Sequence, residues 1–288
     1  MGKFDGILIC TDLDGTLYKN DKTISKENLA AIEYFKGEGG HFTFVTGRLP
    51  YYSLDAARAV SPNVPFGCIN GGGVYDSVSD RYIWTCGLSD GALTLVDYIY
   101  NNTDGVGIQL CGFYKTYFAR ESDATEYFRA VTGVPECPCD YRTFSEPLAK
   151  IIFCTKNEKE MEKTIGLLHS HSLSDRFEFV HSERALFEVL PKGVDKGLSL
   201  LKLADYLGVD RRHTVAVGDY DNDAAMLRTA GLGVAVSNAS PMALAAADVV
   251  TVSNEENAIA KIIYDIESGE LDLDRLGAAK LGERCDNG

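Results

Sequence analysis

Short apolar runs alternate with amphipathic segments at the start of the chain. Residues 4–11 form a β-rich apolar run that ends abruptly in acidic and glycine residues, which is typical of a buried strand meeting a loop. Residues 25–38 carry apolar side chains at helical spacing behind a serine suited to capping a helix, and residues 41–45 form a second apolar run. This order of strand, helix and strand predicts a right-handed βαβ unit with a parallel sheet.

The rhythm changes near Gly87, and the parallel rhythm resumes at Lys196. Between these points paired short strands alternate with helices, which is typical of an antiparallel α+β domain, and afterwards helices and strands alternate singly again. We therefore predict an α/β fold with a Rossmann-like parallel-sheet core and an inserted α+β cap domain. The predicted parts are a first core segment at 1–84, a cap that selects the substrate at 85–185, and a second core segment with a loose C-terminal tail at 186–288.

Composition and charge narrow the class of protein. The chain has 288 residues, of which 45% are hydrophobic and 24% charged, as in an ordinary globular protein. A formal net charge of −14 argues against a nucleic-acid or anionic-membrane partner, because such proteins usually present a basic surface. No stretch of about 18 consecutive apolar residues predicts a membrane span. Eight scattered cysteines without a signal peptide indicate reduced thiols and a cytoplasmic location, while the oligomeric state is left open.

Three loops rich in acidic or hydroxyl side chains follow predicted strands. The carboxyl ends of parallel strands form the ligand crevice of an open sheet, so these loops are expected to share one site. They are Asp12-Leu13-Asp14-Gly15-Thr16, Thr46-Gly47-Arg48 and Gly218-Asp219-Tyr220-Asp221-Asn222-Asp223.

The carboxylates in these loops are suited to a divalent cation. Asp12 and Asp219, with the backbone carbonyl of Asp14, would form a hard oxygen site of the kind that Mg²⁺ prefers. Asp223 is expected to support this site by holding a water bound to the metal. Mg²⁺ is therefore the predicted cofactor.

The same loops predict transfer of a phosphoryl group. Attack by the Asp12 carboxylate on phosphorus would give an acyl-phosphate that water then hydrolyses, which divides one difficult displacement into two easier ones. Asp14 would protonate the leaving alcohol and later deprotonate the attacking water. Thr46 and Lys196 would supply a hydroxyl donor and a positive charge to the transferring group.

The chain resembles the haloacid dehalogenase-like superfamily, and within it the Cof-type sugar-phosphate phosphatases with a large α/β cap. The resemblance rests on DLDGT at 12–16, TGR at 46–48, NGG at 70–72, the lysine of PKGVDKG at 191–197 and GDYDNDAAML at 218–227. It implies Asp12 and Asp14 as catalytic residues, Asp12, Asp14, Asp219 and Asp223 around the metal, and Thr46, Gly47, Arg48, Lys196 and Asn222 around the phosphate. In this scheme Asn222 positions Lys196 and Arg48 braces its loop.

These observations predict a Mg²⁺-dependent phosphatase. It would hydrolyse a small phosphorylated metabolite through an aspartyl-phosphate, and the resemblance favours a sugar phosphate. One alternative is a phosphomutase that returns the phosphoryl group to the same sugar. Another is a regulator that binds Mg²⁺ and phosphate without turnover, although the complete set of catalytic residues argues against it.

Overall fold

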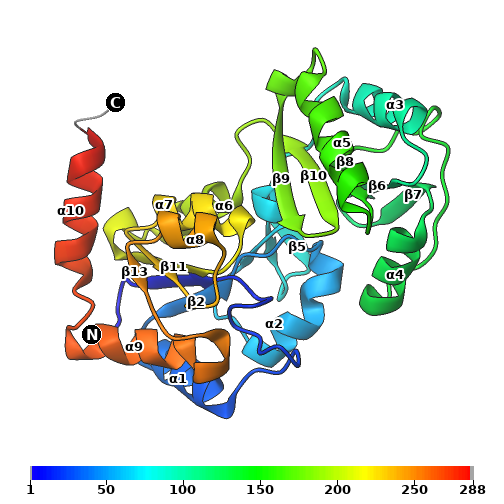
Figure 1. Ribbon diagram of the computed structural model, residues 1–288. Coiled ribbons are helices and arrows are strands. Elements are labelled where there is room, and N and C mark those ends of the chain that lie inside the picture. Colours follow the sequence, from blue (N-terminus) through cyan, green and yellow to red (C-terminus); the bar gives the residue numbers. More distant parts are fainter. Residues whose placement is uncertain (1, 286–288) are drawn as a thin grey trace. The chain divides into compact units, whose positions relative to one another are not determined.

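The computed structural model describes residues 2–285, whose contacts divide the chain into two compact units. The first unit contains the described residues up to Gly47, the segment Ser53–Trp84 and the described residues from Asp195 on. The second contains Arg48–Tyr52 and Thr85–Val194. Figure 1 shows their helices and strands, and within the described range no helix has the length and apolar character needed to cross a membrane.

A five-stranded parallel sheet forms the centre of the first unit. In spatial order its strands are β13 (Val249–Val250), β12 (Leu232–Ala235), β11 (Thr214–Gly218), β1 (Leu8–Thr11) and β2 (His41–Phe44). The chain runs outward from β1 to β2 in one direction and from β11 to β13 in the other. The carboxyl ends of β1 and β11 therefore flank the switch point at which open sheets of this kind bind ligands.

Helices cover both faces of this sheet (Figure 1). On one face α1 (Lys26–Gly37) packs against α9 (Ala258–Ser268). On the other, α7 (Ala224–Thr229) packs between α6 (Lys196–Leu207) and α8 (Pro241–Ala246). The predicted α/β fold with a parallel core is confirmed.

Shorter elements complete the first unit and connect it to the second. They are the 3₁₀ turns η1 (Pro50–Ser53), η2 (Ile69–Gly71), η4 (Arg211–His213), η5 (Asp221–Asp223) and η6 (Asn254–Glu256), the helix α2 (Leu54–Val60), and a sheet of β3 (Phe66–Cys68), β4 (Gly73–Asp76) and β5 (Arg81–Thr85). A parallel bridge between Val45 and Gly67 places the entry to β3 next to the end of β2. The loop after β2 and the turn after β3 are therefore neighbours.

The second unit is built on an antiparallel sheet whose apolar face packs against helices. Its strands, in spatial order, are β7 (Thr116–Arg120), β6 (Gly107–Gly112), β8 (Leu148–Cys154), β10 (Leu186–Pro191) and β9 (Phe177–Glu183). Its helices are α3 (Ala92–Asn102), α4 (Asp123–Thr132), α5 (Glu158–Ser170) and the 3₁₀ turn η3 (Ser174–Arg176). The sequence placed the return to the core at residue 186, but β10 pairs with β8 and β9, so this unit continues to Val194.

The C-terminal segment contains one more helix, α10 (Leu273–Cys285). A loose C-terminal tail was predicted for the last residues, of which 286–288 lie outside the described part of the chain, whereas residues 273–285 are helical. The Lys280 ammonium donates to the backbone carbonyl of Leu227 at 2.7 Å. This hydrogen bond joins α10 to the rest of the first unit. The segment has no regular apolar stripe, so its sequence does not reveal such a contact.

Candidate active site

The ends of β1 and β11 bring three acidic side chains together. Asp12 directly follows β1, and its N–H donates to the carbonyl of Val217 in β11 at 2.8 Å, so the two strands remain paired up to this residue. Asp219 directly follows β11, and Asp223 lies four residues further on. Carboxylate oxygens of Asp12, Asp219 and Asp223 all lie within 4.8 Å of one another. These predicted residues therefore share one site.

Lys196 reaches this site from the first position of α6. Its side chain is 1% exposed, and its ammonium donates to Asp12 Oδ1 and Asp223 Oδ1, each at 2.6 Å. Asp195 caps the helix by accepting the N–H of Leu198 at 3.0 Å, which fixes where α6 begins. Burial lowers the pKa of Lys196, but the carboxylates of Asp12 and Asp223 raise it by more, so the lysine is held as a cation.

Asp223 holds the loop and the lysine in place. Its side chain is fully buried, and its Oδ2 accepts the N–H groups of Asp219 and Tyr220, each at 3.0 Å. Its Oδ1 is the atom that accepts from Lys196. Because both oxygens are engaged by the protein, this carboxylate is better placed to support the site than to bind a ligand directly.

The turn after Asp14 brings the Thr16 hydroxyl within hydrogen-bonding distance of the Asp219 carboxylate. The buried Thr16 hydroxyl donates to Asp219 Oδ1 at 2.8 Å, a contact that sequence reasoning did not assign although Thr16 belongs to the DLDGT segment. Gly15 has a φ of +82°, and a Cβ there would lie 2.4 Å from Asp219 Oδ2, so only glycine fits this turn. Burial, followed by the nearby Asp223 carboxylate, raises the pKa of Asp219 to about 7.

The residues present fit a divalent cation. Burial raises the pKa of Asp12 well above its usual range; Lys196 opposes this, while the carboxylates of Asp223 and Asp219 add to it. One ammonium faces three carboxylates here, which leaves an excess of negative charge when all are ionised. A cation that prefers oxygen ligands removes this excess. Asp12 and Asp219 would hold it, with Asp223 behind them.

The raised pKa of Asp219 predicts that Mg²⁺ stabilises the protein more at high pH. The folded pKa of about 7 lies above the ordinary value of an aspartic acid, so this carboxyl contributes stability at low pH that is lost as the pH rises through about 7. A cation competes with the proton for the same oxygens. We expect the Mg²⁺-induced rise in melting temperature to be larger at about pH 8 than at about pH 5, and Asp219→Asn to remove most of this difference. Calorimetry with Mg²⁺ and with EDTA measures this rise in melting temperature. Equal rises at both pH values would contradict the assignment of Asp219 as a ligand of the cation.

Asp14 lies outside the group of three carboxylates. Its Oδ1 accepts from the Lys22 ammonium at 2.9 Å, and its side chain is 32% exposed. The carboxyl is therefore accessible to water, as a group that gives and takes protons must be. The metal contact expected from its backbone carbonyl remains a prediction.

Thr46 lies two residues after β2 and is hydrogen-bonded to β3 and to the turn that follows it. Its N–H donates to the Gly67 carbonyl at 3.0 Å, and its own carbonyl accepts the N–H of Asn70 at 3.1 Å. Thr46 is 2% exposed. A Cβ on Gly47 would lie 2.9 Å from Asn70 Oδ1, so the predicted phosphate loop packs closely against this turn.

Asn70 belongs to the NGG segment at 70–72, but the sequence assigned no role to its side chain. It has a φ of +49°, is 1% exposed, and its Oδ1 accepts from Asn222 Nδ2 at 3.0 Å. Asn222 was predicted to position Lys196, but its amide contacts Asn70, and the groups that hold the lysine are carboxylates. The Asn-Gly-Gly run after an apolar strand was the available signal for Asn70.

Arg48 is exposed and belongs by its contacts to the second unit.

Asn238 fixes the turn that carries Asp14 from the opposite side. Its Nδ2 donates to the Gly15 carbonyl at 2.9 Å, and its Oδ1 accepts the N–H of Asn254 at 3.0 Å. The loop after β11 is held similarly, because Ser240 donates from its N–H to the Asp219 carbonyl at 2.7 Å. Neighbouring residues thus hold both the turn at Gly15 and the loop that carries Asp219.

The chain matches the model of the haloacid dehalogenase-like hydrolase family over residues 9–263. It is 29% identical over 269 residues to the 5-amino-6-(5-phospho-D-ribitylamino)uracil phosphatase YitU of Bacillus subtilis, covering 90% of this chain and 96% of the relative. Over 256 residues it is 28% identical to the phosphoglycolate phosphatase of Methanopyrus kandleri, covering 89% and 95%. A haloacid dehalogenase-like hydrolase from Bacteroides thetaiotaomicron has the same fold, with a TM-score of 0.78, 24% identity, and coverage of 90% of this chain and 99% of that one.

Proposed function

The chain belongs to the haloacid dehalogenase-like hydrolase family and is a phosphoric monoester hydrolase, and we propose that it acts through an aspartyl-phosphate on Asp12 with Mg²⁺ as cofactor. The observation that carries this proposal is the position of Asp12. It lies buried at a strand end, 2.6 Å from a lysine ammonium and within 4.8 Å of two further carboxylates. A carboxylate in this setting is suited to attack a phosphoryl group whose negative charge is balanced nearby.

In the first step Asp12 attacks phosphorus, and the bond from phosphorus to the leaving oxygen breaks. Asp14 gives its proton to that oxygen, which leaves as a neutral alcohol. Lys196 and Thr46 bind oxygens of the transferring group. When bound at Asp12 and Asp219, Mg²⁺ supplies positive charge that balances the phosphoryl oxygens.

In the second step Asp14 is a carboxylate and takes a proton from a water molecule. The oxygen of this water attacks phosphorus, the acyl-phosphate bond breaks, and inorganic phosphate leaves. Asp12 returns as a carboxylate and Asp14 carries a proton again. Asp14 thus serves as acid and base in turn, which suits its partial exposure.

Substrate selection is assigned to the second unit. The residues proposed for phosphoryl transfer belong to the first unit. They would contact the phosphate group, which different substrates have in common. Two similar relatives are named for unlike leaving groups, a ribitylaminouracil and a glycolate. We favour the phosphate ester of a sugar or a sugar alcohol, and the residues of 85–194 would distinguish it from others.

Phosphate release tests this proposal. The panel holds hexose and pentose phosphates, 5-amino-6-(5-phospho-D-ribitylamino)uracil, phosphoglycolate and p-nitrophenyl phosphate, each with Mg²⁺ and with EDTA. We expect release that requires the cation. Isomerisation that needs a sugar bisphosphate, without free phosphate, would indicate a phosphomutase, and binding without turnover would indicate a regulator.

Asp14→Asn is expected to separate the two steps. With p-nitrophenyl phosphate, whose leaving group needs no proton, we expect one rapid equivalent of nitrophenol per enzyme followed by slow turnover, because water is no longer deprotonated. With an alkyl phosphate we expect a loss of about 10²- to 10⁴-fold already in the first step. Stopped-flow absorbance measures the release of nitrophenol, and an assay of free phosphate measures the turnover of the alkyl phosphate. Rapid steady turnover of an alkyl phosphate by this variant would contradict the acid and base role.

A further inference from the structure

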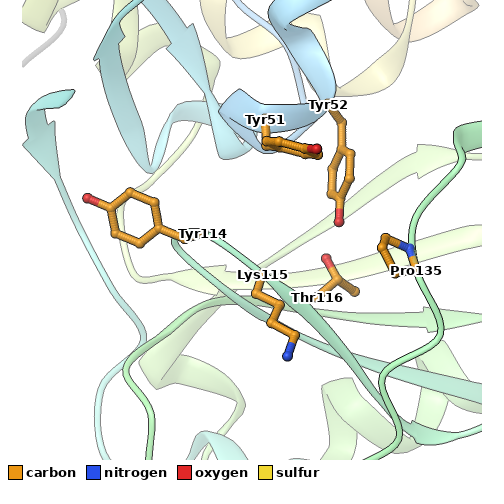
Figure 2. Close-up of a pocket in the computed structure, with 6 residues that line it drawn as sticks. All are labelled: Tyr51, Tyr52, Tyr114, Lys115, Thr116 and Pro135. Atoms are coloured by element: carbon orange, nitrogen blue, oxygen red, sulfur yellow. The ribbon is translucent and has the colours of Figure 1, made fainter. Parts of the chain in front are cut away.

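The second unit contains a pocket of about 220 Å³ that the phosphoryl-transfer residues do not explain. It is lined by Tyr51, Tyr52, Tyr114, Lys115, Thr116 and Pro135. Figure 2 shows the side chains of Tyr51 and Tyr52 on one side and the segment of Tyr114 to Thr116 on the other. Three of its six lining residues are tyrosines, so ring faces and edges make up much of its wall.

Two of these tyrosines are exposed to an unusual degree. Tyr51 is 69% and Tyr114 is 73% exposed, although an aromatic side chain normally removes most of its ring from water. Tyr51 is held in place by an edge-to-face contact with Tyr52, with ring centroids 5.5 Å apart and an angle of 83° between the rings. An exposed but positioned aromatic ring offers a surface on which a second flat ring can stack.

The floor of the pocket is fixed by hydrogen bonds. Thr116 is 3% exposed and hydrogen-bonded to the Tyr52 hydroxyl, and its own hydroxyl also contacts Cys111 Sγ at 3.7 Å. Tyr52 is half-buried, and burial raises its pKa, so it is a neutral phenol at ordinary pH. The floor is therefore polar but uncharged.

The only charged side chain among the described residues that line this pocket is that of Lys115. No carboxylate is among its lining residues. The ammonium of Lys115 lies 4.8 Å from the ring centroid of Tyr117, and Figure 2 shows this side chain directed away from Tyr51 and Tyr52. A flat ring with hydrogen-bonding edges but no net charge fits this lining best.

In the chain, Tyr51 follows Thr46 by five residues. We propose that the pocket binds a planar, uncharged ring carried by the leaving group of the substrate, with Tyr51 and Tyr114 as the residues that select it. This inference rests on the proposed function and narrows it to phosphate esters whose alcohol bears an aromatic or heteroaromatic ring. Thr116 and Tyr52 would contact the polar edge of that ring.

A matched pair of substrates tests the proposal. Benzyl phosphate and cyclohexylmethyl phosphate have leaving alcohols of similar acidity and size, but only the benzyl ring is flat. We expect the wild type to prefer benzyl phosphate in kcat/KM. Tyr51→Leu and Tyr114→Leu should each reduce this preference by about two- to tenfold, mainly through KM, because stacking is lost while the phosphoryl chemistry is kept.

Tyr127→Leu is the matched control, since Tyr127 is 60% exposed in α4 of the same unit but does not line the pocket. It should leave the preference as in the wild type. An unchanged preference in both Tyr51→Leu and Tyr114→Leu would overturn the ring-binding inference while the phosphatase stands. Failure of the wild type to hydrolyse any phosphate ester would instead overturn the proposed function itself.

Discussion

Replacing Asp12 with asparagine is expected to reduce turnover by about 10⁴-fold or more, because an amide does not replace a carboxylate as nucleophile. The fold should survive this change. The asparagine oxygen can still accept from the Lys196 ammonium, which lies 2.6 Å from Asp12 Oδ1. Phosphate release from the best substrate of the panel, with Mg²⁺ present, measures the loss.

The chain offers a matched control for this substitution. Asp272-Leu273-Asp274 repeats the spacing of Asp12 and Asp14, but Asp272 is exposed and lies next to α10, away from the carboxylate group. Asp272→Asn should keep full activity. If Asp12→Asn retained activity near that of this control, the nucleophile would have to be another group.

Replacing Lys196 with methionine is expected to lower the free energy of unfolding by about 3–5 kcal/mol in EDTA, the range found when one partner of a buried ion pair is removed. The lysine is 1% exposed between Asp12 at 7% and Asp223 at 0%, so both carboxylates would lose their cation in a buried site. Activity should fall as well, since the transferring phosphoryl group loses a positive charge. Chemical denaturation at neutral pH measures the stability.

Lys22→Met serves as the comparison, because Lys22 pairs with a carboxylate at an exposed position, with side-chain exposures of 66% and 32%. It should change stability by no more than about 1 kcal/mol. The double variant of Asp12→Asn with Lys196→Met should be more stable than Lys196→Met alone, because one uncompensated charge is gone. A loss as small for Lys196→Met as for Lys22→Met would show that the buried pairs do not stabilise the fold.

Much of the site could be predicted because strand ends are local features. An apolar run that stops at Asp12, and another that stops before Asp219, each mark a carboxyl end, and a parallel sheet brings such ends together. Lys196 was predicted from the segment PKGVDKG at 191–197 and from its position at the start of a helix. These residues do meet in the structure, and Asp223 supports both the lysine and the loop.

Contacts between distant turns were harder to predict. The Asn70 and Thr16 side chains are hydrogen-bonded to Asn222 and Asp219. The segments NGG and DLDGT mark Asn70 and Thr16 as turn residues, but the spacing of the sequence does not identify these distant partners. The strand at 186–191 reads as apolar whichever sheet it joins, so its place beside β8 and β9 is decided by tertiary pairing. α10 likewise depends on contacts with the first unit and not on its own pattern.

Trapping the covalent intermediate tests whether Asp12 is the nucleophile. Asp14→Asn with Mg²⁺ and p-nitrophenyl phosphate should accumulate the acyl-phosphate, which borohydride reduces to an alcohol, so an aspartyl-phosphate becomes homoserine. Mass spectrometry of the peptide containing residues 4–11 and Asp12 then locates the change. We expect homoserine at position 12 only when substrate is present. Nitrophenol release with an unmodified Asp12, or reduction at another carboxylate, would contradict it.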